Sequence, residues 1–190
     1  ARWQGPCLSF DFGGEAVGHF RLRLESAGQM RFRIFYGETV DEITQPPEPE
    51  HLLSRMLTEE YSLPPGRQEF ESRTRSGCRF VRVEFFHCPE AVSVSGWHLR
   101  SSLYPVRYRG TFRSSDPELD RMWRMSRKTL HLCMQEYYLD APKRDRFLWV
   151  ADARLEALFN YYAFNDLDLF RFCWRELAGV QYPDGAIPSA

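Results

Sequence analysis

Hydrophobic residues in the first half of the chain recur at every second position. Residues 19–24, 30–36 and 81–85 alternate apolar side chains with His, Arg or Glu, and Val92 and Val94 begin another short run. This period of two predicts strands of antiparallel sheet with one solvated face. Two such sheets stacked face to face would form a β-sandwich.

Proline separates the early strands from the later ones. Five of the 12 prolines lie within residues 44–66. Because proline lacks an amide donor, we predict a connection here, with a short helical turn at 51–56. The sequence leaves two interpretations of this connection open. It is either a ligand-binding loop or a connection that crosses the sheet edge.

The spacing of the apolar residues changes at Ser115 from that of a strand to that of a helix. This residue can cap a helix by accepting a hydrogen bond from the amide of Glu118, or Asp116 can cap it with Pro117 in the first turn. Apolar residues then recur at helical spacing across 119–137. They predict an amphipathic helix of about five turns.

Two further helices are predicted downstream. Apolar residues recur at helical spacing across 155–162 and 167–177, and Asp166 and Asp168 are start signals for the second of these helices. Ten of the 12 glycines precede residue 111, and none occurs from 111 to 178, which favours helices there. We therefore expect a multi-domain β + α chain, with a β-sandwich over 1–110 that is incomplete at its start and a helical domain over 111–190.

Composition narrows the class of protein. Lys and Arg total 25 against 26 for Asp and Glu, which argues against binding to nucleic acid or to a membrane surface. No apolar run reaches the roughly 20 residues of a membrane span. The five cysteines include no C-x-x-C pair, so we expect reduced thiols and no metal or other cofactor. Neither end of the chain looks like a protein terminus, so we expect a piece of a longer protein.

Charge is concentrated in the segment YYLDAPKRDRFLWVAD, residues 137–152. Because Pro142 ends the first helix, Asp140 and Asp145 are expected in a loop. If the second helix begins near Phe147, Trp149 and Asp152 share one face of its first turn. The charged residues of the segment are Asp140, Lys143, Arg144, Asp145, Arg146 and Asp152.

Such a cluster suits a sugar ring. Carboxylates and guanidinium groups bind hydroxyls, an aromatic side chain stacks on the apolar ring face, and an acid with a raised pKa donates a proton. The alternative interpretation is a set of salt bridges that caps helix ends, in which Asp140, Arg144 and Asp152 neutralise one another.

The string DAPKRDRFLWVAD, residues 140–152, resembles the signature of bacterial α-L-rhamnosidases, the six-hairpin glycosidases of glycoside hydrolase family 78. In that signature an Asp is followed by an Arg–acid pair, a Trp and a further Asp. Residues 105–123 are similar to the start of the family's catalytic domain, and 179–190 to a later loop with a PDG turn. The string CRFVRVEFF resembles the last strands of the preceding β-sandwich. The matching signature residues are Asp140, Arg144, Asp145, Trp149 and Asp152.

The resemblance implies that residues 111–190 begin an (α/α)6 barrel. Its implied activity is the release of terminal α-L-rhamnose by single displacement with inversion, so the implied partner is a rhamnose-containing glycoside or oligosaccharide. Asp145 matches the catalytic general acid. Four further residues match the sugar subsite, namely Asp140, Arg144, Trp149 and Asp152.

The chain departs from the family pattern in two ways. Many members have an R-D-E-R string with Glu as the acid, whereas Arg144-Asp145-Arg146 is one residue shorter. Inversion also needs a general base about 6.5–9.5 Å from the acid. In the family this base is a Glu on a much later hairpin, and spacing assigns neither Glu136 nor Glu156 to that role.

Two other functions stay open. One is a non-catalytic carbohydrate-binding β-sandwich with a helical extension, which would present Trp3, Trp97 or Tyr104 on a sheet face. An accessory sandwich of that kind has no need of the charged string. The other is a different six-hairpin glycosidase, such as a debranching-type glucosidase.

Overall fold

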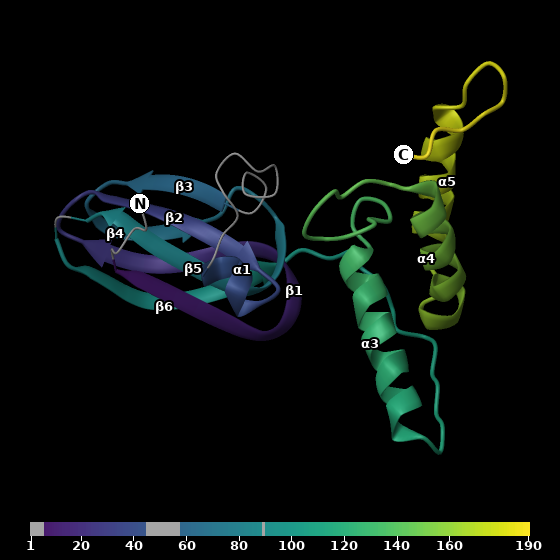
Figure 1. The fold of residues 1–190 in the computed structure, drawn as a ribbon, viewed down its shortest axis with the longest axis horizontal. Coiled ribbons are helices and arrows are strands. Elements are labelled where there is room, and N and C mark those ends of the chain that lie inside the picture. The colour runs from purple at the N-terminus through teal and green to yellow at the C-terminus, as the bar shows by residue number, and fades with distance from the viewer. Residues whose placement is uncertain (1–5, 45–57, 89) are drawn as a thin grey trace. The chain divides into compact units, whose positions relative to one another are not determined.

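The computed structural model describes residues 6–44, 58–88 and 90–190 (Figure 1). They form two compact units that divide between Ser102 and Leu103. The helical turn predicted at 51–56 and the predicted sugar contact Trp3 lie outside the described residues.

The N-terminal unit is an antiparallel sheet with one short helix, α1 (Val40–Thr44). The strands pair in the order β3-β2-β5-β1-β4, and β6 pairs with β1. The strands are β1 (Cys7–Ser26), β2 (Met30–Gly37), β3 (Thr58–Leu63), β4 (Gly66–Glu71), β5 (Ser76–His87) and β6 (Val92–Ser101).

Strand β1 is long enough to pair with different strands along its length. Its residues 7–18 pair with β5, whereas 21–26 lie between β4 and β6. A bulge between Asp11 and Ala16 interrupts the pairing with β5. Gly13 has a φ of 74° within this bulge, a conformation that glycine adopts without steric cost.

The sheet curls around a single hydrophobic core. Phe70 of β4 lies 4.5 Å from Tyr61 of β3 and 5.2 Å from Phe32 of β2, measured between ring centroids. Strands β3 and β4 stand at opposite ends of this pairing order, so the two ends meet across the core. The expected antiparallel β-sandwich is therefore one curled sheet followed by helices. The alternation predicted at 19–24 and 30–36 is confirmed, because every second residue is buried.

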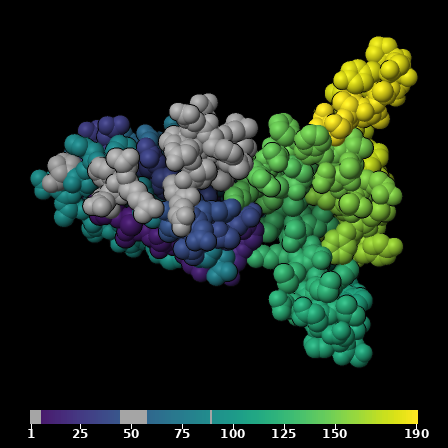
Figure 2. Space-filling view, viewed as in Figure 1, coloured from purple at the N-terminus to yellow at the C-terminus, as the bar shows by residue number. Residues whose placement is uncertain are grey.

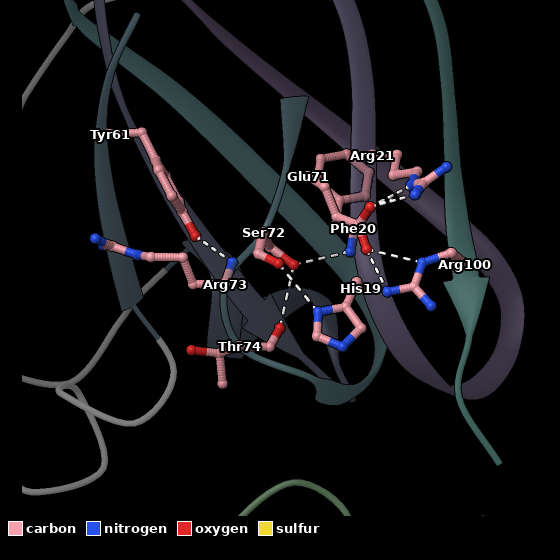
Figure 3. Close-up of polar contacts among 9 residues, drawn as sticks. All are labelled: His19, Phe20, Arg21, Tyr61, Glu71, Ser72, Arg73, Thr74 and Arg100. Atoms are coloured by element: carbon pink, nitrogen blue, oxygen red, sulfur yellow. Dashed lines mark hydrogen bonds and ion pairs between the residues drawn. The ribbon is translucent and has the colours of Figure 1, made fainter. Parts of the chain in front are cut away.

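Polar contacts fasten the end of β4 to its neighbours (Figure 3). The Ser72 hydroxyl accepts a hydrogen bond from the Phe20 amide at 2.9 Å. The Glu71 carboxylate pairs with Arg21 of β1 and Arg100 of β6. Three strands are thus joined by side chains where the backbone pairing of β4 ends.

The predicted connection over 44–66 is wrong in its last part, because Thr58–Leu63 is a strand paired with β2. Pro64 and Pro65 lie between β3 and β4 rather than within either strand. Proline therefore interrupts neither ladder. Gly66 has a φ of 98° at the start of β4, which suits the turn.

The C-terminal unit consists of three helices that run alternately up and down (Figure 1). The Asp116 carboxylate caps the first helix by accepting from the Glu118 amide at 2.9 Å, so Asp116 rather than Ser115 is the cap. Asp166 caps the third helix by accepting from the Leu169 amide at 3.1 Å. The helices are α3 (Pro117–Cys133), α4 (Val150–Ala163) and α5 (Leu167–Gly179). None of the helices in the described ranges is long and apolar enough to cross a bilayer.

Helix α4 corrects the prediction in two respects. It begins at Val150 rather than near Phe147, so Trp149 is its N-cap and does not lie on a helical face with Asp152. Its buried face consists mostly of alanine, whereas the predicted apolar residues other than the half-buried Phe159 are exposed. The buried residues are Ala153, Ala157, Asn160 and Ala163. The exposed residues are Leu155, Leu158 and Tyr162. Small side chains allow the close approach of neighbouring backbone, which explains why this face packs inward.

The segment that leads into α3 packs against the end of α4. The glycine distribution, by contrast, places the boundary between the sheet and helical parts of the chain near Gly110. The amides of Arg109 and Gly110 donate to the Ala163 carbonyl at 3.2 and 2.9 Å. A Cβ atom at Gly110 would lie 1.7 Å from the Tyr162 carbonyl oxygen. Only glycine therefore fits at position 110, where the chain contacts the end of α4, without a shift of the backbone.

We expect Gly110→Ala to destabilise the helical unit by about 1–3 kcal/mol or more, because the added methyl group must displace backbone. Gly179→Ala is the matched control, since a Cβ there meets nothing within 4 Å. Chemical denaturation of both variants measures the difference. Equal unfolding free energies for the two variants would contradict the packing at Gly110.

Candidate active site

Tyr138 anchors the connection between α3 and α4. Its side chain is fully buried, and its hydroxyl accepts a hydrogen bond from the Asn160 carboxamide at 2.9 Å. Its amide donates to the Cys173 sulfur at 3.3 Å. Burial raises the pKa of the Tyr138 hydroxyl, so it stays neutral. The connection is therefore fixed to both α4 and α5 at its start.

Asp140 closes the charged segment into a loop. Its Oδ1 accepts a hydrogen bond from the Phe147 amide at 2.9 Å, and its own amide donates to the Phe147 carbonyl at 3.3 Å. Asp140 is half-buried. Residues 140–147 thus form a loop whose two ends are hydrogen-bonded to each other.

Asp145 lies at a sharp turn of this loop. Asp145 and Arg146 have φ angles of 60° and 61°, in the left-handed region that L-residues other than Asn and Asp seldom adopt. The Asp145 side chain is exposed, and no other described residue forms a hydrogen bond or ion pair with its carboxylate. The turn therefore presents a free carboxyl group.

Three carboxyl groups gather at the start of α4. Glu156 lies one helical turn after Asp152, and its Oε2 is buried without a hydrogen-bond partner among the described residues. Burial raises the pKa of Glu156 to about 8, and the charges of Asp152 and Asp140 add to the effect. Glu156 is therefore mostly protonated at neutral pH, while Asp152 is exposed at the surface.

The spacing of residues in the sequence assigned no role to Glu156. Its spacing of four from Asp152 places both on one side of the helix, and Ala153 and Ala157 flank that side. This spacing is the one signal in the sequence that could have indicated it.

The remaining predicted residues lie on the exposed side of the loop. Trp149 is 36% exposed, and its ring packs edge-on against Phe147 with centroids 6.5 Å apart. Arg144 is exposed and pairs with neither Asp140 nor Asp152 among the described side chains. The described side chains thus give no ion pair of Arg144 with Asp140 or Asp152, which the salt-bridge alternative requires. The structure brings Asp140 and Asp152 together around Glu156.

The C-terminal segment returns to the start of α4. The Val150 amide donates to the Ser189 carbonyl at 2.9 Å. The PDG turn has Gly185 at a φ of 89°, and its amide donates to the Tyr182 carbonyl at 2.9 Å. Figure 2 shows the C-terminal residues projecting from the helical unit. Sequence reasoning matched this segment to the family but did not place it beside Trp149.

The described residues give little support for a metal site or for a sugar-binding face on the sheet. No group of three or more His, Cys, Asp or Glu side chains there is arranged to hold a metal ion. All five cysteines are free thiols, as expected. Trp97 packs against Phe10 and Phe12 in the sheet, whereas the Tyr104 hydroxyl donates to Asp166 in the helical unit. Of the aromatic residues considered for a sugar-binding sheet face, Trp97 lies exposed on the sheet and Tyr104 lies in the helical unit.

Comparison with known proteins shows which family the helical unit resembles. Residues 107–190 match the family model described as the bacterial alpha-L-rhamnosidase 6 hairpin glycosidase domain. This part of the chain is thus similar to the bacterial α-L-rhamnosidases. The resemblance of the 140–152 string is thereby confirmed at the level of the family. No curated protein matches the chain.

Solved rhamnosidase structures match the sheet as well as the helices. A rhamnosidase from Klebsiella oxytoca with rhamnose bound has a TM-score of 0.85 at 28% identity, over 97% of this chain and 38% of its own. A GH78 family rhamnosidase of Bacillus sp. GL1 has a TM-score of 0.82 at 29% identity, over 96% of this chain and 19% of its own. The α-L-rhamnosidase of Streptomyces avermitilis, complexed with L-rhamnose, shares the fold with a TM-score of 0.68 at 24% identity. The chain thus spans 38% or less of the length of these rhamnosidases.

The buried Glu156 predicts a pH-dependent stability. The folded state holds a proton between pH 4.5 and about 8 that the unfolded state has lost, so the unfolding free energy falls as pH rises through this window. Glu156→Gln keeps the shape without the ionisation. We expect it to be more stable than the original protein by about 1–3 kcal/mol at pH 9, with a smaller difference at pH 4.

Chemical denaturation from pH 4 to pH 9 measures both proteins. Glu118→Gln, at an exposed position on α3, is the control and should leave the pH slope unchanged. Parallel pH profiles for Glu156→Gln and the original protein would show that Glu156 is ionised in the folded state.

Proposed function

We propose that the complete protein that contains this chain hydrolyses terminal α-L-rhamnosides with inversion at the anomeric carbon. The family match and the rhamnosidase structures support a glycosidase of this class. The observation that carries the proposal is the closed loop 140–147, which presents the Asp145 carboxyl at its turn and is followed in the chain by exposed Trp149 and Asp152.

In this proposal Asp145 is the general acid. Its proton passes to the glycosidic oxygen while the bond from C1 to that oxygen breaks and the electron pair stays on the leaving oxygen. Water attacks C1 from the opposite face and gives its proton to a carboxylate base. We place that base on a later hairpin, outside residues 1–190, as in the family.

Four residues are proposed to hold the sugar. The exposed face of Trp149 offers a surface on which an apolar ring face can stack. Arg144 donates hydrogen bonds to hydroxyl groups, and Asp152 accepts them. Asp140 uses Oδ1 for the Phe147 amide, which leaves Oδ2 for a sugar hydroxyl.

We further propose that α3, α4 and α5 are the first helices of an (α/α)6 barrel. Large apolar side chains stay exposed on all three helices, as expected for surfaces that further hairpins cover. On α3 they are Leu119, Met122 and Met125, on α4 Leu155 and Leu158, and on α5 Phe172 and Trp174.

In the complete protein, we expect Asp145→Asn to lower kcat on phenyl α-L-rhamnoside by about 10²–10⁴-fold, because the amide cannot donate the acid's proton. KM should change little. Asp168→Asn, at an exposed position on α5, is the matched control and should keep full activity. Steady-state kinetics, with NMR of the first-formed sugar anomer, measures both rate and stereochemistry.

A panel of aryl glycosides separates the alternatives. Turnover of α-glucosides in place of α-rhamnosides would indicate a different six-hairpin glycosidase. Rhamnose binding without turnover, unchanged in Asp145→Asn, would indicate a carbohydrate-binding module instead.

A further inference from the structure

We propose that Arg146 is a positioning residue for Asp145. Its guanidinium group fastens the loop from within, and this holds the left-handed turn that presents the carboxyl group. The inference rests on the proposed function, in which Asp145 is the general acid.

The turn at Asp145 and Arg146 needs an external restraint. Two consecutive residues other than glycine have φ angles near 60°. Each left-handed residue costs on the order of 1–2 kcal/mol, so the isolated loop would favour other conformations. The surrounding contacts must therefore determine the conformation.

Arg146 supplies most of these contacts. Its Nε and Nη2 both donate to the Lys143 carbonyl, at 3.3 and 3.2 Å. Its amide donates to the Arg144 carbonyl at 2.8 Å. Its carbonyl accepts from the Tyr137 hydroxyl at 3.4 Å. The side chain of Arg146 thus contacts the backbone before the turn, and its carbonyl contacts Tyr137 at the start of the connection that follows α3.

The restraint acts on the backbone and leaves the acid free. The Asp140 carboxylate holds the Phe147 amide at 2.9 Å on the other side of the turn. The Asp145 carboxyl has no such contact among the described residues. Its position therefore follows from the turn, and any drift of the turn moves the acid away from a glycosidic oxygen.

Arginine is suited to this task because its planar fork offers two N–H groups to one carbonyl. Lysine at 146 keeps the charge but lacks the fork. Asparagine at 146 lacks the guanidinium group but tolerates a positive φ. Comparing the two separates the guanidinium contact from the backbone preference.

The experiment measures how strongly each variant depends on the leaving group. Arg146→Asn and Arg146→Lys are compared with the original complete protein on phenyl and 2,4-dinitrophenyl α-L-rhamnoside. A good leaving group departs without protonation, so a misplaced acid slows only the phenyl substrate. Arg154→Asn, at an exposed position on α4, is the control.

We expect kcat to fall about 10–100-fold on the phenyl substrate and less than about threefold on the dinitrophenyl substrate. KM and the melting temperature should stay close to the original values. Arg146→Lys should lie between Arg146→Asn and the original protein. Asp145→Asn should show the same dependence on the leaving group, with a larger loss.

Two results would overturn the inference while the proposed function stands. One is an equal loss on both substrates with a lowered melting temperature, which would make Arg146 merely structural. The other is full activity of both variants. If the original protein hydrolyses neither rhamnoside, the proposed function fails first and the inference fails with it. If Arg146→Asn does not fold, Arg146→Lys decides by the same criteria.

Discussion

The carboxamide of Asn160 is the interaction on which the helical unit depends. It is fully buried, and it donates to the Tyr138 hydroxyl and the Asp166 carbonyl while it accepts from the Asp166 amide. A buried polar group without partners costs about 1–3 kcal/mol, so these contacts must form together. They join the connection after α3, the helix α4 and the start of α5.

The loop divides structural and chemical tasks between its residues. Asp140 and Arg146 direct their polar side-chain groups to the backbone. The exposed side chains of Asp145 and Trp149 stay available to a ligand. The buried carboxyl of Glu156 takes up a proton, which limits the negative charge at the start of α4 to the outer acids.

Patterns in the sequence predicted those features that depend on neighbouring residues. Alternation at 19–24 and 30–36 reflects which side of the strand is buried, and the cap at Asp116 depends on an amide two residues away. Strand β3 was missed because prolines surround it and its alternate residues are mostly polar. The inward face of α4 was missed because large apolar residues occur on its other side, and sequence alone does not show which side packs.

The site depends on contacts that no local pattern contains. The raised pKa of Glu156 needs both Asp152 on the same helix and Asp140 in the preceding loop. The left-handed turn at Asp145 carries no glycine to indicate it. The family string located the segment, but the geometry that makes it usable comes from Tyr138, Asn160 and the tertiary packing around them.

The contact between Val150 and Ser189 also sets an order of events during synthesis. The first amides of a helix have no partner within the helix, and the Val150 amide finds one in the Ser189 carbonyl. A ribosome delivers the loop and α4 well before Ser189 emerges. The start of α4 therefore acquires its final partner late, and the site reaches its finished geometry only after α5 and the PDG turn have formed.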